Sequence, residues 1–128
     1  METATPLGAQ GATISREAVG LLLEYTGRGP TKAKTLFNHD TVVIILEDAL
    51  TKGERMLADL GRTEHVLQTR REYQAAMRTE LTALIERETG RTVIAFMSAN
   101  HVDPDAAAEV FLLEPETPEA ETPGDRLE

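Results

Sequence analysis

The sequence contains no cysteine and no tryptophan, and aromatic residues make up only 4% of its 128 residues. Without cysteine, the chain can form no disulfide and offers no thiolate metal ligand and no cysteine nucleophile. Because aromatic side chains are so few, the core must be built mostly from Val, Leu, Ile, Ala and Met. The length suits one domain with a single modest core.

Long apolar runs and an excess of positive charge are also missing. The longest apolar run, VVIIL at residues 42–46, is far shorter than the roughly 20 residues of a membrane-spanning helix. The N-terminus shows no signal-peptide pattern. The formal net charge is -9, whereas nonspecific nucleic-acid binding needs a cationic surface. We therefore expect a cytoplasmic protein with no transmembrane segment and no nucleic-acid partner.

Apolar periodicity and turn residues predict a single α+β domain over residues 14–115, with elements in the order α-β-β-α-α-β-β. The expected helices span residues 14–26, 51–60 and 63–89, and the expected strands span 31–37, 41–47, 92–98 and 106–113. The sequence TKGE at 51–54 fits a helix capping box. We expect Arg70 and Glu109 to face solvent, residues 1–13 to form a flexible arm, and residues 116–128 to form a disordered acidic tail.

Two halves of the sequence echo each other. Thr-Gly-Arg occurs at residues 26–28 and again at 89–91, each time after an expected helix, and an Asn-His pair follows each copy in an expected hairpin turn. The echo predicts two helix-plus-hairpin units. We expect their hairpins to pair into one four-stranded antiparallel sheet, with the helices covering one face.

The stretch GRGPTKAK at residues 27–34 places three cations close together in an acidic chain. A phosphate-binding loop needs a different glycine spacing and lies between a strand and a following helix, whereas here the helix comes first. Lys32 and Lys34 share one face of the expected strand. With Arg28 they form a candidate docking or anion-binding edge. The alternative is that they are ordinary solvated charges that discourage edge-to-edge strand pairing.

Two histidines occupy the expected hairpin turns, each close to an acid. His39 precedes Asp40, and His101 is followed by Asp103. If both hairpins point the same way, these four side chains could converge on zinc or a similar ion. The alternative, that they are exposed turn histidines, stays open.

The sequence contains few residues in patterns that are typical of catalytic sites. Ser15 and Ser98 are the two serines, and the nucleophile motif G-x-S-x-G does not occur. Paired acids could still perform acid–base chemistry if the fold brought them together. We expect no enzyme and no cofactor.

The long helix indicates self-association. A helix of about 26 residues is roughly 39 Å long, which exceeds the width of a four-stranded sheet. Part of its apolar face would then need another partner. We therefore expect a homodimer; the alternative is a monomer with one protruding, polar helix end.

Two longer segments resemble a known family. GRGPTKAKTLFNHDTVVIILEDALTKGERML and AFMSANHVDPDAAAEVFLLEP are similar to the MpsC-like family, and the likeness covers about residues 14–115. Position 99 is Ala, where the family pattern leads us to expect Asp or another polar residue. The positions that match the family motifs are Gly27, Arg28, Gly29, Pro30, Thr31, Lys32, Asn100, His101, Asp103 and Pro104.

The resemblance implies a function but no catalytic residues. The family is named for a sodium-translocating system that generates membrane potential, and it is also connected with inorganic-carbon uptake. It therefore implies a small soluble accessory or regulatory protein that binds a membrane protein complex at the periphery of the membrane. The alternatives are a small-anion or nucleotide sensor, and a metal-dependent enzyme at the two histidine turns.

Overall fold

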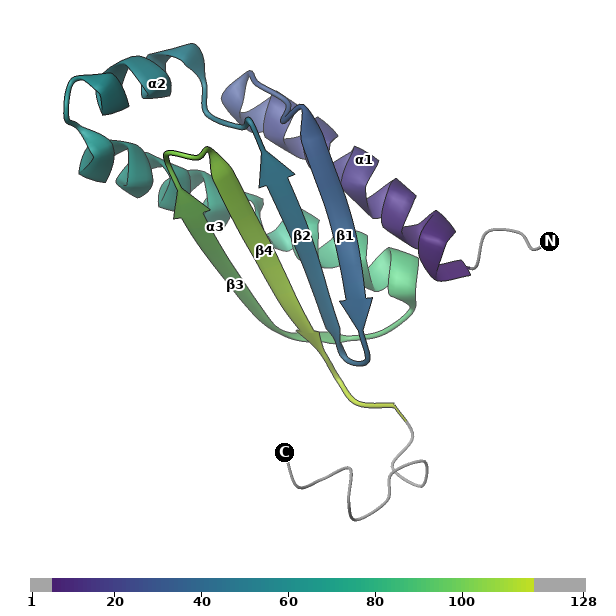
Figure 1. The fold of residues 1–128 in the computed structure, drawn as a ribbon. Coiled ribbons are helices and arrows are strands. Elements are labelled where there is room, and N and C mark those ends of the chain that lie inside the picture. The colour runs from purple at the N-terminus through teal and green to yellow at the C-terminus, as the bar shows by residue number, and fades with distance from the viewer. Residues whose placement is uncertain (1–5, 117–128) are drawn as a thin grey trace.

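A computed structural model describes residues 6–116 of the chain. Three helices and four strands follow in the expected order (Figure 1). The helices are α1 (Pro6–Thr26), α2 (Lys52–Asp59) and α3 (Thr63–Thr89), and the strands are β1 (Lys32–Asn38), β2 (Thr41–Glu47), β3 (Val93–His101) and β4 (Ala106–Leu113). Within the part of the chain that the structure describes, no helix is long and apolar enough to cross a membrane.

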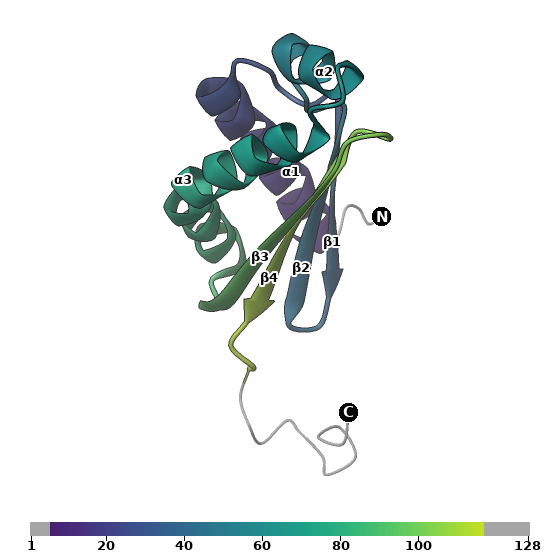
Figure 2. The ribbon, with the colours of Figure 1, turned by 90° about the vertical axis from the view of Figure 1, so that its left-hand side faces the viewer.

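The four strands form one antiparallel sheet in the order β1-β2-β4-β3. Each hairpin stays intact, and the two meet through β2 and β4 at the centre of the sheet. The three helices lie on one side of the sheet, and no described helix or strand covers the other side, which we call the uncovered face (Figure 2). The predicted fold class is therefore confirmed.

The core lies between the sheet and helices α1 and α3. It is aliphatic apart from Phe111, as the composition predicts, and includes Ile14, Leu22, Ile44, Met77 and Leu81. The apolar face of α3 packs against α1, α2 and the sheet of its own chain. The length of α3 is thus no reason to expect a dimer.

Both copies of Thr-Gly-Arg end a helix in the same way. The glycines, Gly27 and Gly90, have φ of +85° and +71°, a left-handed conformation that suits glycine at a helix C-terminus. The hydroxyls of Thr26 and Thr89 donate to the carbonyls four residues earlier and accept from the N–H of the following arginine. The sequence echo therefore reflects one helix-stop motif used twice.

The structure differs from the sequence prediction at the N-terminus. Helix α1 begins at Pro6, so the prediction of a flexible arm is wrong for residues 6–13. The side chain of Gln10 donates to the carbonyl of Glu88, and Gly11 lies against Phe37. These contacts to distant residues stabilise residues 6–13 as part of α1, although the composition of this segment does not indicate a helix. Residues 1–5, and residues 117–128 of the predicted acidic tail, lie outside the described residues.

Candidate functional site

Four charged residues and one threonine form a connected cluster at the end of the sheet next to α2. We call it the Asp48 network: Arg28, Thr31, Asp48, Arg55 and Asp105. Arg28 follows α1, Asp48 follows β2, Arg55 lies on α2, and Asp105 ends the turn between β3 and β4. The Asp48 network therefore ties together both segments that carry the family resemblance.

Asp48 is at the centre of this network. Its carboxylate lies 2.6 Å from the Arg28 guanidinium, accepts a 2.9 Å hydrogen bond from the Thr31 hydroxyl, and pairs with Arg55. The Thr31 hydrogen bond, followed by the one from Arg28, lowers the pKa of Asp48. The backbone of Asp48 has a φ of +61°, which is uncommon for a non-glycine residue. This conformation is held by hydrogen bonds from its N–H to the Asp105 carbonyl and from Arg28 to its own carbonyl.

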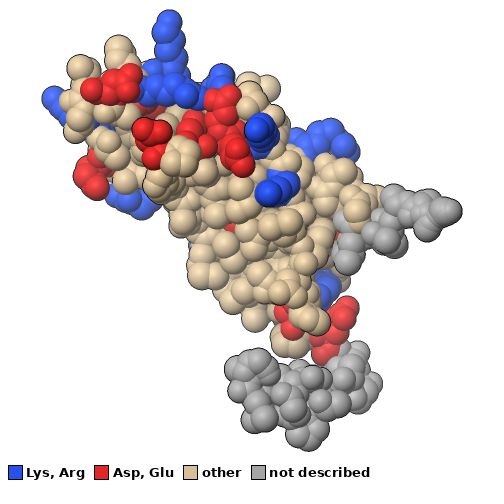
Figure 3. Space-filling view, viewed as in Figure 1, with Lys and Arg blue, Asp and Glu red and all other residues tan. Residues whose placement is uncertain are grey.

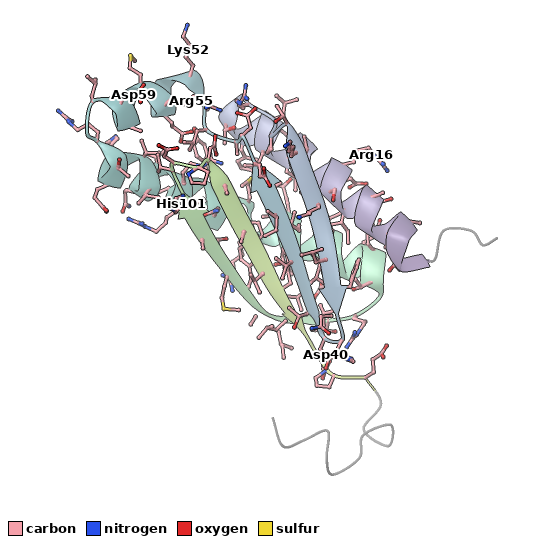
Figure 4. The ribbon with its side chains drawn as sticks, in the orientation of Figure 1. Arg16, Asp40, Lys52, Arg55, Asp59 and His101 are labelled. Carbon is pink, nitrogen blue, oxygen red and sulfur yellow. The ribbon has the colours of Figure 1, made fainter. Side chains whose placement is uncertain are left out.

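Asp105 closes the network on the other side. Its carboxylate accepts a 2.9 Å hydrogen bond from the Leu50 N–H and lies 3.2 Å from Arg55. Beside these groups is a hollow of about 430 Å³ between α2, the start of α3 and the β3–β4 turn. It is lined by Leu50, Arg55, Ala58, Asp59, Thr63, Val102 and Asp103. Arg55, Asp59 and Lys52 appear together at this end of the molecule (Figure 4).

The predicted cationic edge is divided by the structure. Arg28 is occupied by Asp48, whereas Lys32 and Lys34 are exposed on the uncovered face of the sheet, as their spacing predicts. Among the described residues, no hydrogen bond or ion pair engages either lysine side chain. Gly29 and Pro30 have a packing role, because a Cβ on Gly29 would lie 3.2 Å from Val19 Cγ1 and Pro30 is buried.

The alternative of a metal site shared by the two histidine turns is wrong. His39 and Asp40 form the β1–β2 turn beside the end of β4, while His101 and Asp103 lie at the β3–β4 turn beside the end of β2. The antiparallel pairing of β2 with β4 makes the two hairpins point in opposite directions, and Figure 4 shows Asp40 and His101 at opposite ends. Within residues 6–116, no group of three His, Asp or Glu side chains could hold a metal ion.

Each of these turns has its own local partners. Arg91 pairs with Asp40 and donates to the His39 carbonyl. The His101 ring nitrogen Nδ1 lies 2.8 Å from the Pro104 carbonyl oxygen. The arginines of the two Thr-Gly-Arg copies therefore bind acids at opposite ends of β2, Arg91 at its start and Arg28 at its finish.

A buried polar cluster lies between α3 and the sheet. Glu109 is 1% exposed, so the prediction that it faces solvent is wrong. Its carboxylate accepts hydrogen bonds from Ser98 and Gln74, and Gln74 also pairs with Asn100. Burial raises the pKa of Glu109, although the hydrogen bonds from Ser98 and Gln74 oppose this. The period-two pattern of β4 was a signal for this burial, since Ala107, Glu109, Phe111 and Leu113 share one face.

Arg70 was also predicted to face solvent and is 2% exposed. Its guanidinium lies 3.2 Å from the Glu54 carboxylate, which completes the predicted capping box of α2 by accepting from the Thr51 N–H. The capping box is therefore confirmed, and α3 supplies the cation that its buried carboxylate needs. The sequence shows the cap but not its distant partner.

The protein belongs to the class of small two-layer α+β domains. Its clustered charged side chains form ion pairs with one another. A family model described as the Na⁺-translocating membrane potential-generating system (MpsC) matches residues 8–115. The chain therefore belongs to the MpsC family, which confirms the resemblance seen in the sequence. Neither curated proteins nor solved structures give a match.

Proposed function

We propose that this protein is a non-enzymatic, cytoplasmic accessory component of a membrane Na⁺-translocating system, and that it binds that system through the corner formed by the Asp48 network and the neighbouring hollow. The family description supports the connection with membrane potential. One observation supports this docking surface: the two segments that resemble the family meet at the Asp48 network. Asp48 and Asp105, which belong to different segments, are more than fifty residues apart in the chain.

The groups in this corner suit docking rather than catalysis. Asp48 and Asp105 are bound by arginines, a threonine hydroxyl and a backbone N–H, and the pKa of Asp48 is lowered, so it stays ionised near neutral pH. A general base works best with a pKa near the working pH. Asp59 and Asp103 remain exposed at the hollow and offer negative charge to a basic segment of the membrane complex.

Cells that lack the protein should hold a lower Na⁺-dependent membrane potential, measured with a potential-sensitive dye. Reintroducing the wild type should restore it, and Asp59→Lys should restore it poorly. Asp59 is exposed at the C-terminal end of α2, where a cation suits the helix dipole, so folding should be preserved. Arg28 is unsuitable for this test because it pairs with Asp48 inside the network.

The control is Glu24→Lys, the same charge reversal on the exposed side of α1. It should restore the membrane potential as well as the wild type does. An unchanged potential in cells lacking the protein would contradict the function. Full restoration by Asp59→Lys would contradict the docking corner alone.

The anion-sensor alternative keeps only two of its three cations, since Arg28 is occupied. Lys32 and Lys34 remain exposed on β1. A thermal-shift screen over bicarbonate, phosphate and nucleotides would favour this alternative if one anion raised the melting temperature. Ligand at a hundredfold excess over Kd stabilises by about 2.7 kcal/mol.

A further inference from the structure

The uncovered face of the sheet has an apolar middle that spans all four strands. Viewed from that side, it has few charged side chains over its middle (Figure 3). Its outward-facing apolar residues are Leu36 on β1, Val43 and Ile45 on β2, Ala108, Val110 and Leu112 on β4, and Ala95, Met97 and Ala99 on β3. Polar side chains border them on the same face: Lys32, Lys34, Asn38, Thr41, Glu47 and His101. Leu36 and Met97 are about half exposed, at 50% and 48%. A contiguous apolar surface of this kind is typical of an interaction site.

We propose that a second copy of this chain covers this face, sheet against sheet. The proposal is independent of the docking corner, which lies at the end of the sheet. Residues 117–128 cannot supply the cover, because Ala120 and Leu127 are their only aliphatic side chains and Glu119, Glu121, Asp125 and Glu128 are acidic. Burying such charges against an apolar face would be costly.

The size of the face fits a weak but specific dimer. The strands contain seven to nine residues, and with strands ~4.8 Å apart and ~3.3 Å per residue the whole face, including its polar margins, projects to about 450 Å². Two copies would bury at least about 900 Å², close to the roughly 1,000 Å² of the smallest specific interfaces. Two apolar sheet faces pack about 10 Å apart with their strands nearly aligned.

The register of the sheet favours one two-fold arrangement. An axis parallel to the strands places β1 of one copy over β3 of the other, and β2 over β4, with the same ends together. Through the ladder, Leu36 lies level with Met97, Val43 with Val110, and Ile45 with Ala108. The two half-exposed apolar side chains then cover each other, Ile45 meets the smaller Ala108, and Val43 meets Val110.

The two possible axes differ in what the lysines of β1 would face. Lys32 and Lys34 lie at the β1 margin of the face, so this axis places them over the β3 margin of the second copy. There Lys34 meets the small, exposed Ala99, and Lys32 lies level with His101. An axis across the strands would instead place β1 over β1 and β3 over β3, with Ala99 remote from either lysine.

Ala99 therefore gives a matched pair of test variants. In the proposed dimer, Ala99→Glu faces Lys34 of the second copy and should tighten association, whereas Ala99→Lys should weaken it. Two symmetric ion pairs form per dimer, so each change in Kd should be on the order of tenfold at low salt. The double variant Lys34→Glu with Ala99→Lys should restore association to about the wild-type level.

Sedimentation equilibrium measures this directly. The wild type should move from 14.0 kDa towards twice that mass as its concentration rises into the micromolar range. Lys52→Glu, on α2 and away from the face, is the control and should leave Kd unchanged. Circular dichroism and melting temperature check that each variant folds, which the exposure of Ala99 favours.

Three results would overturn the proposal. A wild type that stays monomeric up to about 1 mM would mean that something other than a second copy covers the face. Equal effects of Ala99→Glu and Ala99→Lys would refute the strand-parallel axis. A loss of association in Lys52→Glu as large as that in Ala99→Lys would place the interface elsewhere.

Discussion

At the scale of single residues, Glu109 is the least expected side chain in the fold. Its carboxylate is buried between α3 and the sheet, and its hydrogen-bond donors are uncharged. Burial disfavours the charged form and raises the pKa. Glu109 therefore makes the stability of the protein depend on pH.

Replacing Glu109 with Gln should remove this dependence. A raised folded-state pKa gives stability that is complete below the unfolded pKa and is lost as pH rises through the folded pKa. Glu109→Gln keeps a carbonyl for Gln74 and an amide that can donate to the Ser98 hydroxyl. The melting temperature of Glu109→Gln should therefore rise relative to that of the wild type as the pH increases from 4 to 8.

Thermal unfolding at several pH values measures this difference. The conservative control is Glu86→Gln, at a half-buried acid on α3 whose carboxylate accepts from a backbone N–H. It should show no such gain with rising pH. Parallel melting curves for Glu109→Gln and wild type across this pH range would contradict the prediction.

At the scale of elements, the Thr-Gly-Arg motif sets where α1 and α3 stop. Gly27 and Gly90 adopt positive φ, and the arginine that follows each glycine reaches an acid at one end of β2. One local motif thus ends a helix and also fixes the central strand relative to that helix. The motif works twice because the two halves of the fold have the same helix-then-hairpin order.

Gly27→Ala and Gly90→Ala should each destabilise the fold by about 1–2 kcal/mol, the cost of a left-handed L-residue. Apart from the adjoining residues of the chain, no atom lies within 4 Å of an added Cβ at either position, so backbone strain alone should cause the loss. Chemical denaturation measures it. The matched control is Gly20→Ala inside α1, also with open space around it, which should stabilise by roughly 0.5–1 kcal/mol. A destabilised control would show that the loss is not specific to positive φ.

At the scale of the whole molecule, the Asp48 network closes the upper end of the fold. It joins the end of α1, the start of β1, the end of β2, α2 and the β3–β4 turn. The network depends on the pairing of β2 with β4, because Asp48 follows β2 and Asp105 precedes β4, and it lies at the exposed end of the sheet rather than in the core. The corner should therefore open before the core does.

Acid should loosen this corner first. The Thr31 hydroxyl and Arg28 lower the pKa of Asp48, so its contribution to stability is present above the unfolded pKa and is lost as pH falls through the folded value. Asp48→Asn should have a lower melting temperature than the wild type at pH 7, and the gap should close towards pH 3. Hydrogen exchange should accelerate at the start of α2 and in the β3–β4 turn.

Two outcomes would contradict this view of the corner. One is a constant gap between Asp48→Asn and wild type from pH 7 to pH 3. The other is faster exchange in the buried strands β2 and β4 without any change at the β3–β4 turn.

The sequence by itself determined the elements and their faces. Apolar periodicity set the helices and strands, TKGE set the cap of α2, and alternation placed Lys32 and Lys34 on one face of β1. These features depend on interactions between residues close together in the chain, so a local pattern is enough to predict them. The family resemblance likewise lay in two contiguous segments.

Only the tertiary structure decided which ends meet. The pairing of β2 with β4 separates His39 from His101, brings Asp105 to Asp48, and turns Glu109 inward beside Gln74. Arg70 likewise finds Glu54 across two helices. A charged side chain has the same local signature whether it faces water or a buried partner, and its partner is chosen by strand pairing and helix packing over long separations.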